Sequence, residues 1–481
     1  MSARSHETMR TITAAAIGAQ LLAHTPGAGA SQPGGSPSAA VSKPTLVTLD
    51  PAKVGRARLI VEESHDLPLV DVALTFRTGA ALDPAEKLGR TRVFGRMLRR
   101  GAEGWTNDAI EERLDALGAE LGVEVGVSSL TVHLQVIKRN LAPALELMRA
   151  IVSKPTFPEA ELDKLRREIV AELIELRDND KALASRAFRR GLFGAHPYGR
   201  PNAGTIASIP TLTRDDIRAA YDLHIKRDGV IASVSGDLTL DEVHALVVPL
   251  IESVPAGPAP IDATPEPTVG KGRRLIFVDK PTRTQTQILI GGSGTFARDA
   301  DHVALNVANT IFGGTFTARL MKEIRSERGW SYGASSRLPI ERRREAFSMW
   351  TFPAATDAAV CLTLELELLE KLLKDGVSDA EVAFAKGYLG QSWAFEIDTA
   401  SKRVRQVVDE DVLDLPADYH SGYVEHIAAV TTAQANAALR ARLSSDDLLI
   451  VVVGTAGTLK DEIVKAIPRL ASVEVVPFDR D

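Results

Sequence analysis

The chain has 481 residues, of which 44% are hydrophobic and 25% charged, and this balance is that of an ordinary globular protein of roughly two to four domains. Its net charge of −6 gives no reason to expect a nucleic-acid-binding surface. The sequence contains no apolar run of the roughly 18 to 20 residues that a membrane-spanning helix needs. The single cysteine, Cys361, excludes an internal disulfide and a multi-thiolate metal site.

The first 44 residues have the features of an export signal followed by a disordered lead-in. Arg10 precedes a modestly apolar run, and the AGA before Ser31 has the small-x-small form of a signal peptidase site. Residues 31–43 are rich in Gly, Ser and Pro, a composition typical of disorder. We therefore predict that residues 1–44 are a signal peptide and lead-in and that the protein is periplasmic or otherwise exported. The alternative is a flexible tail on a cytoplasmic protein.

The next segments predict a strand and two helices. LVDVALTFRTGAALD (residues 69–83) indicates a strand that ends in a glycine-containing turn. A helix is predicted to start directly after it, because Asp83 can act as its N-cap, Pro84 suits the first turn and Glu86 stands three residues after the cap. TFPEAELDKLRREIVAELIELRD (residues 156–178) predicts a long helix, since five of its apolar residues fall on one helical stripe: Leu162, Leu165, Ile169, Leu173 and Leu176.

The chain reads as an internal duplication. Residues 253–274 contain five prolines and no hydrophobic periodicity, which indicates a linker. Each half on either side of it closes with a capped helix, a continuous apolar strand and another helix. The two strands, GVIASVSGDL and DLLIVVVGTA, lie about 218 positions apart. We predict an α+β protein with two homologous domains, residues 45–252 and 275–481, called here the first half and the second half.

Three segments resemble the insulinase/pitrilysin family of zinc peptidases. They are FRTGAALDPAEKLGRTRVFGRMLRRGA, HPYGRPNAGTIASIPTLTRDDIRAAY and FGGTFTARLMKEIRSERGWSYGASS, in this order. The resemblance covers about residues 45–475 and is to the shorter branch typified by mitochondrial processing peptidase and its bacterial periplasmic relatives. It implies two homologous α/β halves, a mitochondrial-processing-peptidase-like sandwich, that together form half of a clam-shell chamber.

The resemblance also shows where a metal site should lie. Active members carry His-x-x-Glu-His on the first helix, where two histidines bind zinc and the glutamate is the general base, and a later glutamate is the third ligand. In this chain the three motif positions hold Arg92, Gly95 and Arg96, whereas the later position retains a glutamate, Glu172. One carboxylate cannot replace three protein ligands, and guanidinium groups repel a divalent cation. We therefore predict no metal in this chain.

Two interpretations of the arginines remain open. Arg92, Arg96 and Arg99 fall on one helical stripe, which is most often a solvated face. Alternatively, Arg92 or Arg96 forms an ion pair with Glu172 and so fills the vacant metal site, because guanidinium and carboxylate groups match well in geometry. The strand that grips substrate in active members carries an Asn-Ala pair, and here Gly122–Val123 occupies those positions.

The second half retains more of the family's pattern. Active sites of the family receive an arginine and a tyrosine from a second half, which stabilise the anionic intermediate. Tyr332 is the candidate tyrosine, with Arg319, Arg325 and Arg328 as nearby candidates for the arginine, and a packed strand residue is the alternative for Tyr332. Gly313 and Gly314 are candidates for a substrate-contacting loop, or for a turn between helices that requires glycine.

These features predict a non-catalytic subunit of a heterodimeric zinc metallopeptidase. The chain would have no cofactor of its own, since the zinc would belong to a metal-bearing partner subunit, and the two would enclose unfolded peptides. Transition-state-stabilising residues from the second half would then act in trans. A structural subunit of the kind found in respiratory-complex core proteins, or a stand-alone peptide-binding protein, are the alternatives.

Overall fold

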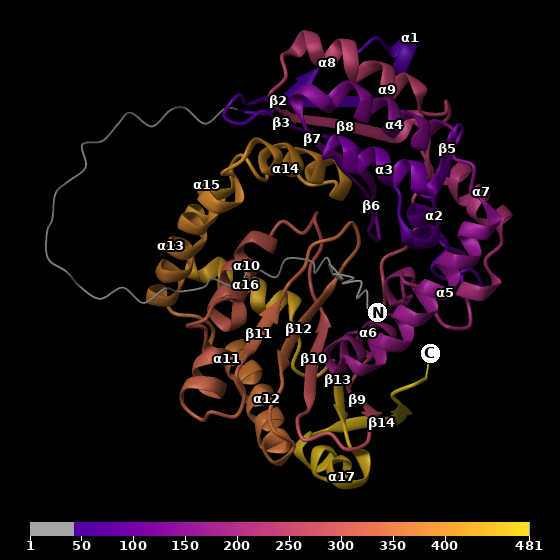
Figure 1. Ribbon diagram of the computed structural model, residues 1–481. Helices are drawn as coiled ribbons and strands as arrows, with labels where there is room; N and C mark the ends of the chain where they lie inside the picture. Colours follow the sequence, from indigo (N-terminus) through magenta and orange to yellow (C-terminus); the bar gives the residue numbers. More distant parts are fainter. Residues whose placement is uncertain (1–42, 481) are drawn as a thin grey trace, which may run out of the picture. The chain divides into compact units, whose positions relative to one another are not determined.

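The computed structural model describes residues 43–480 (Figure 1). The predicted signal peptide, its cleavage site before Ser31 and nearly all of the lead-in lie outside these residues. Within residues 43–480, no helix is long and apolar enough to cross a membrane.

The first half contains a six-stranded sheet in the order β1-β2-β8-β3-β7-β6. Strands β2 and β8 are parallel and the other neighbours antiparallel. Inward and outward residues alternate along β3, so that Val70, Val72 and Leu74 reach the helix-covered core. The strands are β1 (Thr45–Val47), β2 (Arg58–Glu63), β3 (Leu69–Phe76), β6 (Glu120–Val125), β7 (Leu130–Ile137) and β8 (Val230–Gly236), and β4 (Gly101–Ala102) and β5 (Trp105–Thr106) form a separate ribbon.

Nine α-helices accompany these strands in the described part of this half, and most of them cover one face of its sheet. They are α1 (Pro51–Val54), α2 (Arg90–Leu98), α3 (Asn107–Leu117), α4 (Leu141–Ser153), α5 (Glu159–Glu175), α6 (Asp180–Phe193), α7 (Arg214–His224), α8 (Leu240–Leu246) and α9 (Val248–Ser253).

The second half repeats this plan with the strand order β11-β12-β10-β13-β9-β14. The parallel strands β9 and β13 correspond to β2 and β8, and β13 is buried along its whole length. The edge strand β14 is also parallel to β9, whereas the edge strand β1 of the first sheet is antiparallel to β2. The duplicated α+β fold predicted from the sequence is therefore confirmed. The strands are β9 (Arg273–Asp279), β10 (Gln287–Ser293), β11 (Ala334–Arg337), β12 (Ala346–Thr351), β13 (Leu449–Gly454) and β14 (Leu470–Pro477). The helices are α10 (His302–Asn309), α11 (Arg319–Met321), α12 (Ala358–Asp375), α13 (Asp379–Glu396), α14 (Ala400–Leu413), α15 (Tyr423–Ala429), α16 (Thr432–Arg442) and α17 (Ala456–Ala466).

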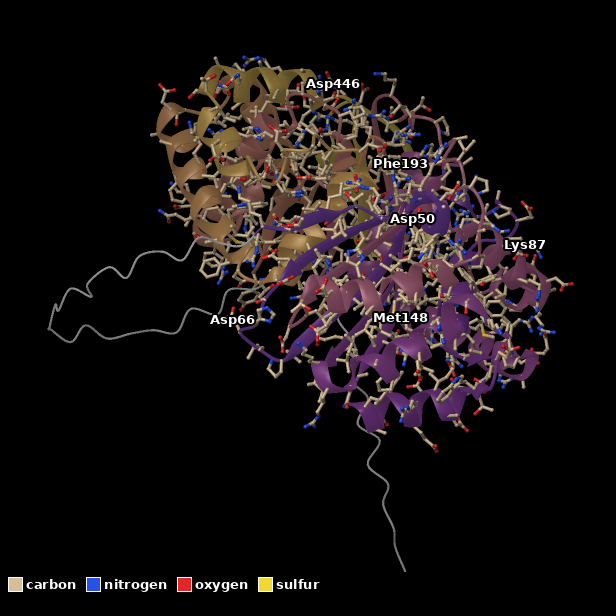
Figure 2. All side chains as sticks on the ribbon, turned by 90° about the horizontal axis from the view of Figure 1, so that it is seen from above. Asp50, Asp66, Lys87, Met148, Phe193 and Asp446 are labelled. Atoms are coloured by element: carbon tan, nitrogen blue, oxygen red, sulfur yellow. The ribbon has the colours of Figure 1, made fainter. Side chains whose placement is uncertain are left out.

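Each sheet is covered on its second face by a helix from the other half. Helix α6 of the first half packs on β9, β10 and β13 of the second half, where Phe188 and Leu192 join a buried cluster with Val451 (Figure 1). Phe193, the last residue of α6 and labelled in Figure 2, belongs to the same cluster. Reciprocally, α14 of the second half packs on β2 and β8, where Val404 and its neighbours meet the first sheet. The two halves therefore share their cores.

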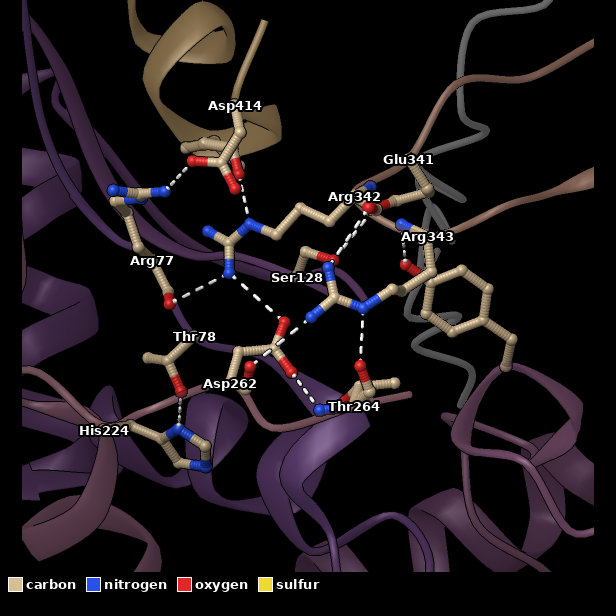
Figure 3. A network of polar contacts seen from close by, with 12 residues as sticks. Arg77, Thr78, Ser128, His224, Asp262, Thr264, Glu341, Arg342, Arg343 and Asp414 are labelled. Atoms are coloured by element: carbon tan, nitrogen blue, oxygen red, sulfur yellow. Dashed lines mark hydrogen bonds and ion pairs between the residues drawn. The ribbon is translucent and has the colours of Figure 1, made fainter. Parts of the chain in front are cut away.

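A polar network joins the two halves and the segment between them (Figure 3). Residues 254–272 contain no helix or strand, yet the loop before β12 binds them, because Arg342 pairs with Asp262 at 3.4 Å and Arg343 donates to the Thr264 carbonyl. The same loop accepts a hydrogen bond from the first half, since Ser128 Oγ donates to Glu341 at 2.9 Å. The predicted linker is thus held against both halves.

The exchanged helix makes a testable prediction. We expect Phe188→Ala to lower the free energy of unfolding by about 3–5 kcal/mol, as for other buried phenylalanines. The lost amide protection should appear in β10 and β13, far away in sequence, when hydrogen exchange is followed by mass spectrometry. Phe384→Ala, at an exposed position, is the control and should change neither the free energy of unfolding nor the amide protection. If Phe188→Ala lost protection only in the first half, α6 would not support the second sheet as described.

Candidate functional site

Helix α2 carries the positions of the lost metal motif, and a buried polar chain fixes its start. The predicted start next to Asp83 is wrong: the helix begins at Arg90, after Gly89 in the left-handed conformation (φ 85°). Asp83 still caps it, because its carboxylate accepts hydrogen bonds from the backbone N–H and the hydroxyl of Thr91. His224 is hydrogen-bonded to Thr91 Oγ1 at 2.9 Å. Its other ring nitrogen is hydrogen-bonded to Thr78 Oγ1 at 2.7 Å (Figure 3).

Burial determines the charge states of the two titratable groups among these hydrogen-bonded side chains, Asp83 and His224. Desolvation raises the pKa of Asp83 to about 6 and lowers the pKa of His224 to about 3. His224 is therefore neutral near neutral pH, and it stacks on Phe94 of α2. These side chains make their contacts inside the protein and not with solvent, so their role is to hold helix α2 in position.

The face of α2 toward α5 holds an ion pair where active members bind zinc. One guanidinium nitrogen of Arg96, Nη1, lies 2.9 Å from both carboxylate oxygens of Glu172, and Nη2 lies 3.5 Å from Glu168. Of the two interpretations of the arginine stripe, the ion pair therefore describes Arg96. Arg92 is exposed, as a solvated face requires, and Arg99 pairs with Glu111 at 2.9 Å.

The ion pair closes the site without adding much stability. The side chains of Arg96 and Glu172 are 29% and 49% exposed, and ion pairs so open to solvent contribute at most about 1 kcal/mol. Arg100 adds a second link from the end of α2 to Glu168. The main effect of these contacts is to occupy the carboxylates that face α2.

Strand β6 leaves no room for a side chain at the position of the lost general base. A Cβ atom on Gly95 would lie 2.8 Å from Val125 Cγ2 and 3.2 Å from Val123 Cγ1. Gly122 precedes Val123 on β6, and a Cβ atom on it would lie 2.2 Å from the ring of His133 on the neighbouring strand β7. Gly122 and Val123, which replace the Asn-Ala pair, therefore fit the close packing of β6 against β7 and α2. Nothing in the sequence had indicated this close fit.

Zinc does not fit this site. A hollow of about 350 Å³ beside Gly95 is lined by Arg96, Arg99, Arg100 and Lys164, with Glu111 as its one carboxylate, and these cations repel a zinc ion. Across residues 43–480, no three His, Cys, Asp or Glu side chains are grouped so that they could hold a metal ion.

The candidates in the second half differ in their surroundings. Tyr332 lies in the turn before β11 and is 79% exposed, so it is not a packed strand residue. The Arg325 guanidinium lies 4.6 Å from the centre of the Phe316 ring. Arg319 instead forms a fork with Glu381, at 2.7 and 2.8 Å, which gives it a structural role.

The remaining candidates have local partners. Arg328 pairs with Glu323 at 2.7 Å. Gly313 and Gly314 end a π-helical stretch, Thr310–Gly314, and a Cβ on Gly313 would lie 2.4 Å from the backbone nitrogen of Ser336. Close packing against β11 therefore requires glycine at position 313, whereas Gly314 has more space around it.

The tight contact at Gly95 makes a prediction with an internal control. We expect Gly95→Ala to lower the free energy of unfolding by about 1–3 kcal/mol, because its new methyl group collides with Val125. Gly390→Ala in α13 meets no atom within 4 Å and should instead stabilise by up to about 1 kcal/mol through helix propensity. Urea denaturation measures both. Adding Val125→Ala should relieve the Gly95→Ala defect; equal stability of Gly95→Ala and the original chain would contradict the packing described.

Comparisons with known proteins agree with this geometry. Residues 58–206 match the family described as "Insulinase (Peptidase family M16)", and residues 211–389 match "Peptidase M16 inactive domain". A Helicobacter pylori protein named non-peptidase homolog YmxG is 22% identical over 82% of this chain and 91% of its own length. An uncharacterized zinc protease of Mycobacterium leprae is 28% identical over 70% of this chain and 76% of its own length.

Solved structures show the same fold. A peptidase M16 inactive domain from Pseudomonas fluorescens superimposes with a TM-score of 0.79 at 27% identity, over 85% of this chain and 98% of the other. A Helicobacter pylori protease structure superimposes with a TM-score of 0.74 at 17% identity, over 86% and 99% of the two chains. The chain belongs to the insulinase family, peptidase family M16.

Proposed function

We propose that the chain is the non-catalytic subunit of a heterodimeric zinc metallopeptidase. A second, metal-bearing member of the family would supply zinc and general base, and the two chains would enclose unfolded peptides. The observation that carries the proposal is the contrast between the halves. In the first half, Arg96 is bonded to Glu172 and leaves no metal site, whereas the second half presents Tyr332 to solvent.

The exposure of Tyr332 supports a role outside this chain. A tyrosine kept only for packing would bury its ring, but this one is exposed and Arg325 stands seven positions before it. A phenol and a guanidinium can donate hydrogen bonds to an anionic intermediate. We therefore propose Tyr332 and Arg325 as the pair offered to the partner's active site, and we assign Arg319 to the structure because it is held by Glu381.

Two other functions compete with this one. A purely structural subunit would need no exposed Tyr332, and a stand-alone peptide-binding protein would need no partner. We also propose that the complex is exported, on the strength of the residues before Ser31. Affinity purification of the full chain from its native host tests the partnership: the proposal expects a zinc-containing family member in equimolar amount. Recovery of the chain alone, as a homodimer, would favour the stand-alone role.

The catalytic contribution makes a prediction of its own. In the assembled complex, we expect Tyr332→Phe to lower kcat by about 10²–10³, as for loss of an oxyanion donor, with assembly unchanged by light scattering. Arg325→Ala should behave similarly. Arg328→Ala is the matched control, because Arg328 is nearby but bonded to Glu323, and it should leave kcat unchanged. Unchanged kcat in Tyr332→Phe would favour the structural alternative.

A further inference from the structure

Helix α13 presents an uncharged aromatic face to solvent. Phe384, Tyr388 and Phe395 are 57%, 45% and 72% exposed, although apolar side chains of this size are usually buried. At helical spacing they form one stripe, with Gln391 between them. We call these three aromatic residues the aromatic stripe. All exposed residues between positions 383 and 395 lack charge: Ala383, Phe384, Gly387, Tyr388, Gln391, Ala394 and Phe395.

The duplication supplies an internal comparison for this face. Helix α5 is the counterpart of α13 in the first half, and the two start 220 positions apart (379 − 159). Beyond the first turn of each helix, six equivalent positions between 163 and 175 of α5 and between 383 and 395 of α13 are exposed on both helices. On α5 four of the six are charged, whereas none is charged on α13: Asp163, Lys164, Arg167, Ala171, Ile174 and Glu175 against Ala383, Phe384, Gly387, Gln391, Ala394 and Phe395. The fold therefore does not require an apolar surface here.

We propose that the aromatic stripe of α13 binds an extended, uncharged peptide segment rich in aliphatic or aromatic side chains. This inference rests on the proposed peptide-handling role but not on the heterodimer. Aromatic rings bind apolar side chains over large areas at a small cost in side-chain entropy. A carboxylate would lose its hydration on this face without gaining a partner, so the stripe selects against acidic residues.

The size of the stripe favours a peptide over a subunit. Its three side chains expose roughly 350 Å², less than half of the roughly 800 Å² that each partner contributes to a stable interface. From Phe384 to Phe395 the stripe is roughly 17 Å long, which matches about five residues of an extended chain. Cβ atoms on Gly387 and Gly390 would meet nothing within 4 Å, so the surface beside the aromatic rings has room for a peptide side chain.

The stripe continues toward the predicted substrate loop. Phe384 lines a hollow of about 890 Å³ together with Thr315 and Thr317, which follow Gly314. Between these threonines, Phe316 is 66% exposed, and it adds a fourth ring at this end. A peptide on α13 would therefore pass directly to the segment that carries Arg325, whose guanidinium covers Phe316.

Fluorescence anisotropy of the full chain with labelled eight-residue peptides tests the proposal. One peptide alternates leucine or phenylalanine with serine or glutamine and has blocked ends; the second replaces two of its apolar residues with glutamate. We expect saturable binding of the first peptide only. The double variant Phe384→Ser/Phe395→Ser should weaken it at least tenfold, and Gln391→Glu, which only adds a charge to the stripe, at least threefold.

The matched control is Lys164→Ser/Glu175→Ser at the equivalent positions of α5, which should leave the affinity unchanged. Thermal unfolding verifies that the exposed substitutions leave the fold intact. Equal affinity of the stripe variants and the original chain, or equal weakening by the control, would overturn the proposal. So would loss of partner assembly with peptide binding retained, because the stripe would then be a subunit contact. Absence of a partner would leave the anisotropy result standing.

Discussion

The exchange of helices between the two halves is the constraint on which the rest of the structure depends. Each half covers one face of its sheet with its own helices, and the second face carries a smaller apolar cluster. Helix α6 covers this cluster on the second sheet and α14 covers it on the first, so each half needs a helix of the other to bury it. The loop around Arg342 adds polar links between the halves (Figure 3). Because these elements fix the two halves to each other, surfaces on the preceding helices are fixed as well: α5 runs into α6, and α13 into α14.

Both surfaces of functional interest lie on these preceding helices. On α5, Glu172 meets Arg96 and closes the former metal site; on α13, the equivalent region carries the aromatic stripe. An arginine suits the vacated site because its fork can bridge two carboxylates, here Glu172 and Glu168, across the gap between two helices. Arg96 thereby links α2 to α5 at the positions where the family resemblance places the metal of active members.

Much of this could be predicted from the sequence, for physical reasons that particular residues show. The duplication was visible because buried strands such as β8 and β13 are continuous apolar runs bounded by capped helices. An ion pair of Arg92 or Arg96 with Glu172 was one of two interpretations left open by helical spacing and the family resemblance, and the structure forms it with Arg96. The start of α2 was misplaced because Asp83 has the form of a local cap but acts across eight residues on Thr91. Caps of this kind depend on the path of the intervening turn, which local patterns do not describe.

Other features could not be predicted because they depend on which surfaces meet. The apolar residues of α6 and α14 indicate a buried face but not which sheet covers it. For the same reason Phe384 and Phe395 are indistinguishable in sequence from core residues, and only the fold shows that they are exposed. The contact between Gly95 and Val125 likewise follows from the approach of β6 to α2.

The central claim is that the arginine–glutamate ion pair has replaced the metal site. Its most direct test is zinc titration of the purified full chain by isothermal calorimetry, with elemental analysis of the protein as isolated. We expect no stoichiometric zinc in either measurement, because Arg96 occupies Glu172 and Glu168, and no third ligand is grouped with them among residues 43–480. One tightly bound equivalent that disappears in Glu172→Gln would contradict it, since zinc would then compete successfully with the guanidinium for that carboxylate.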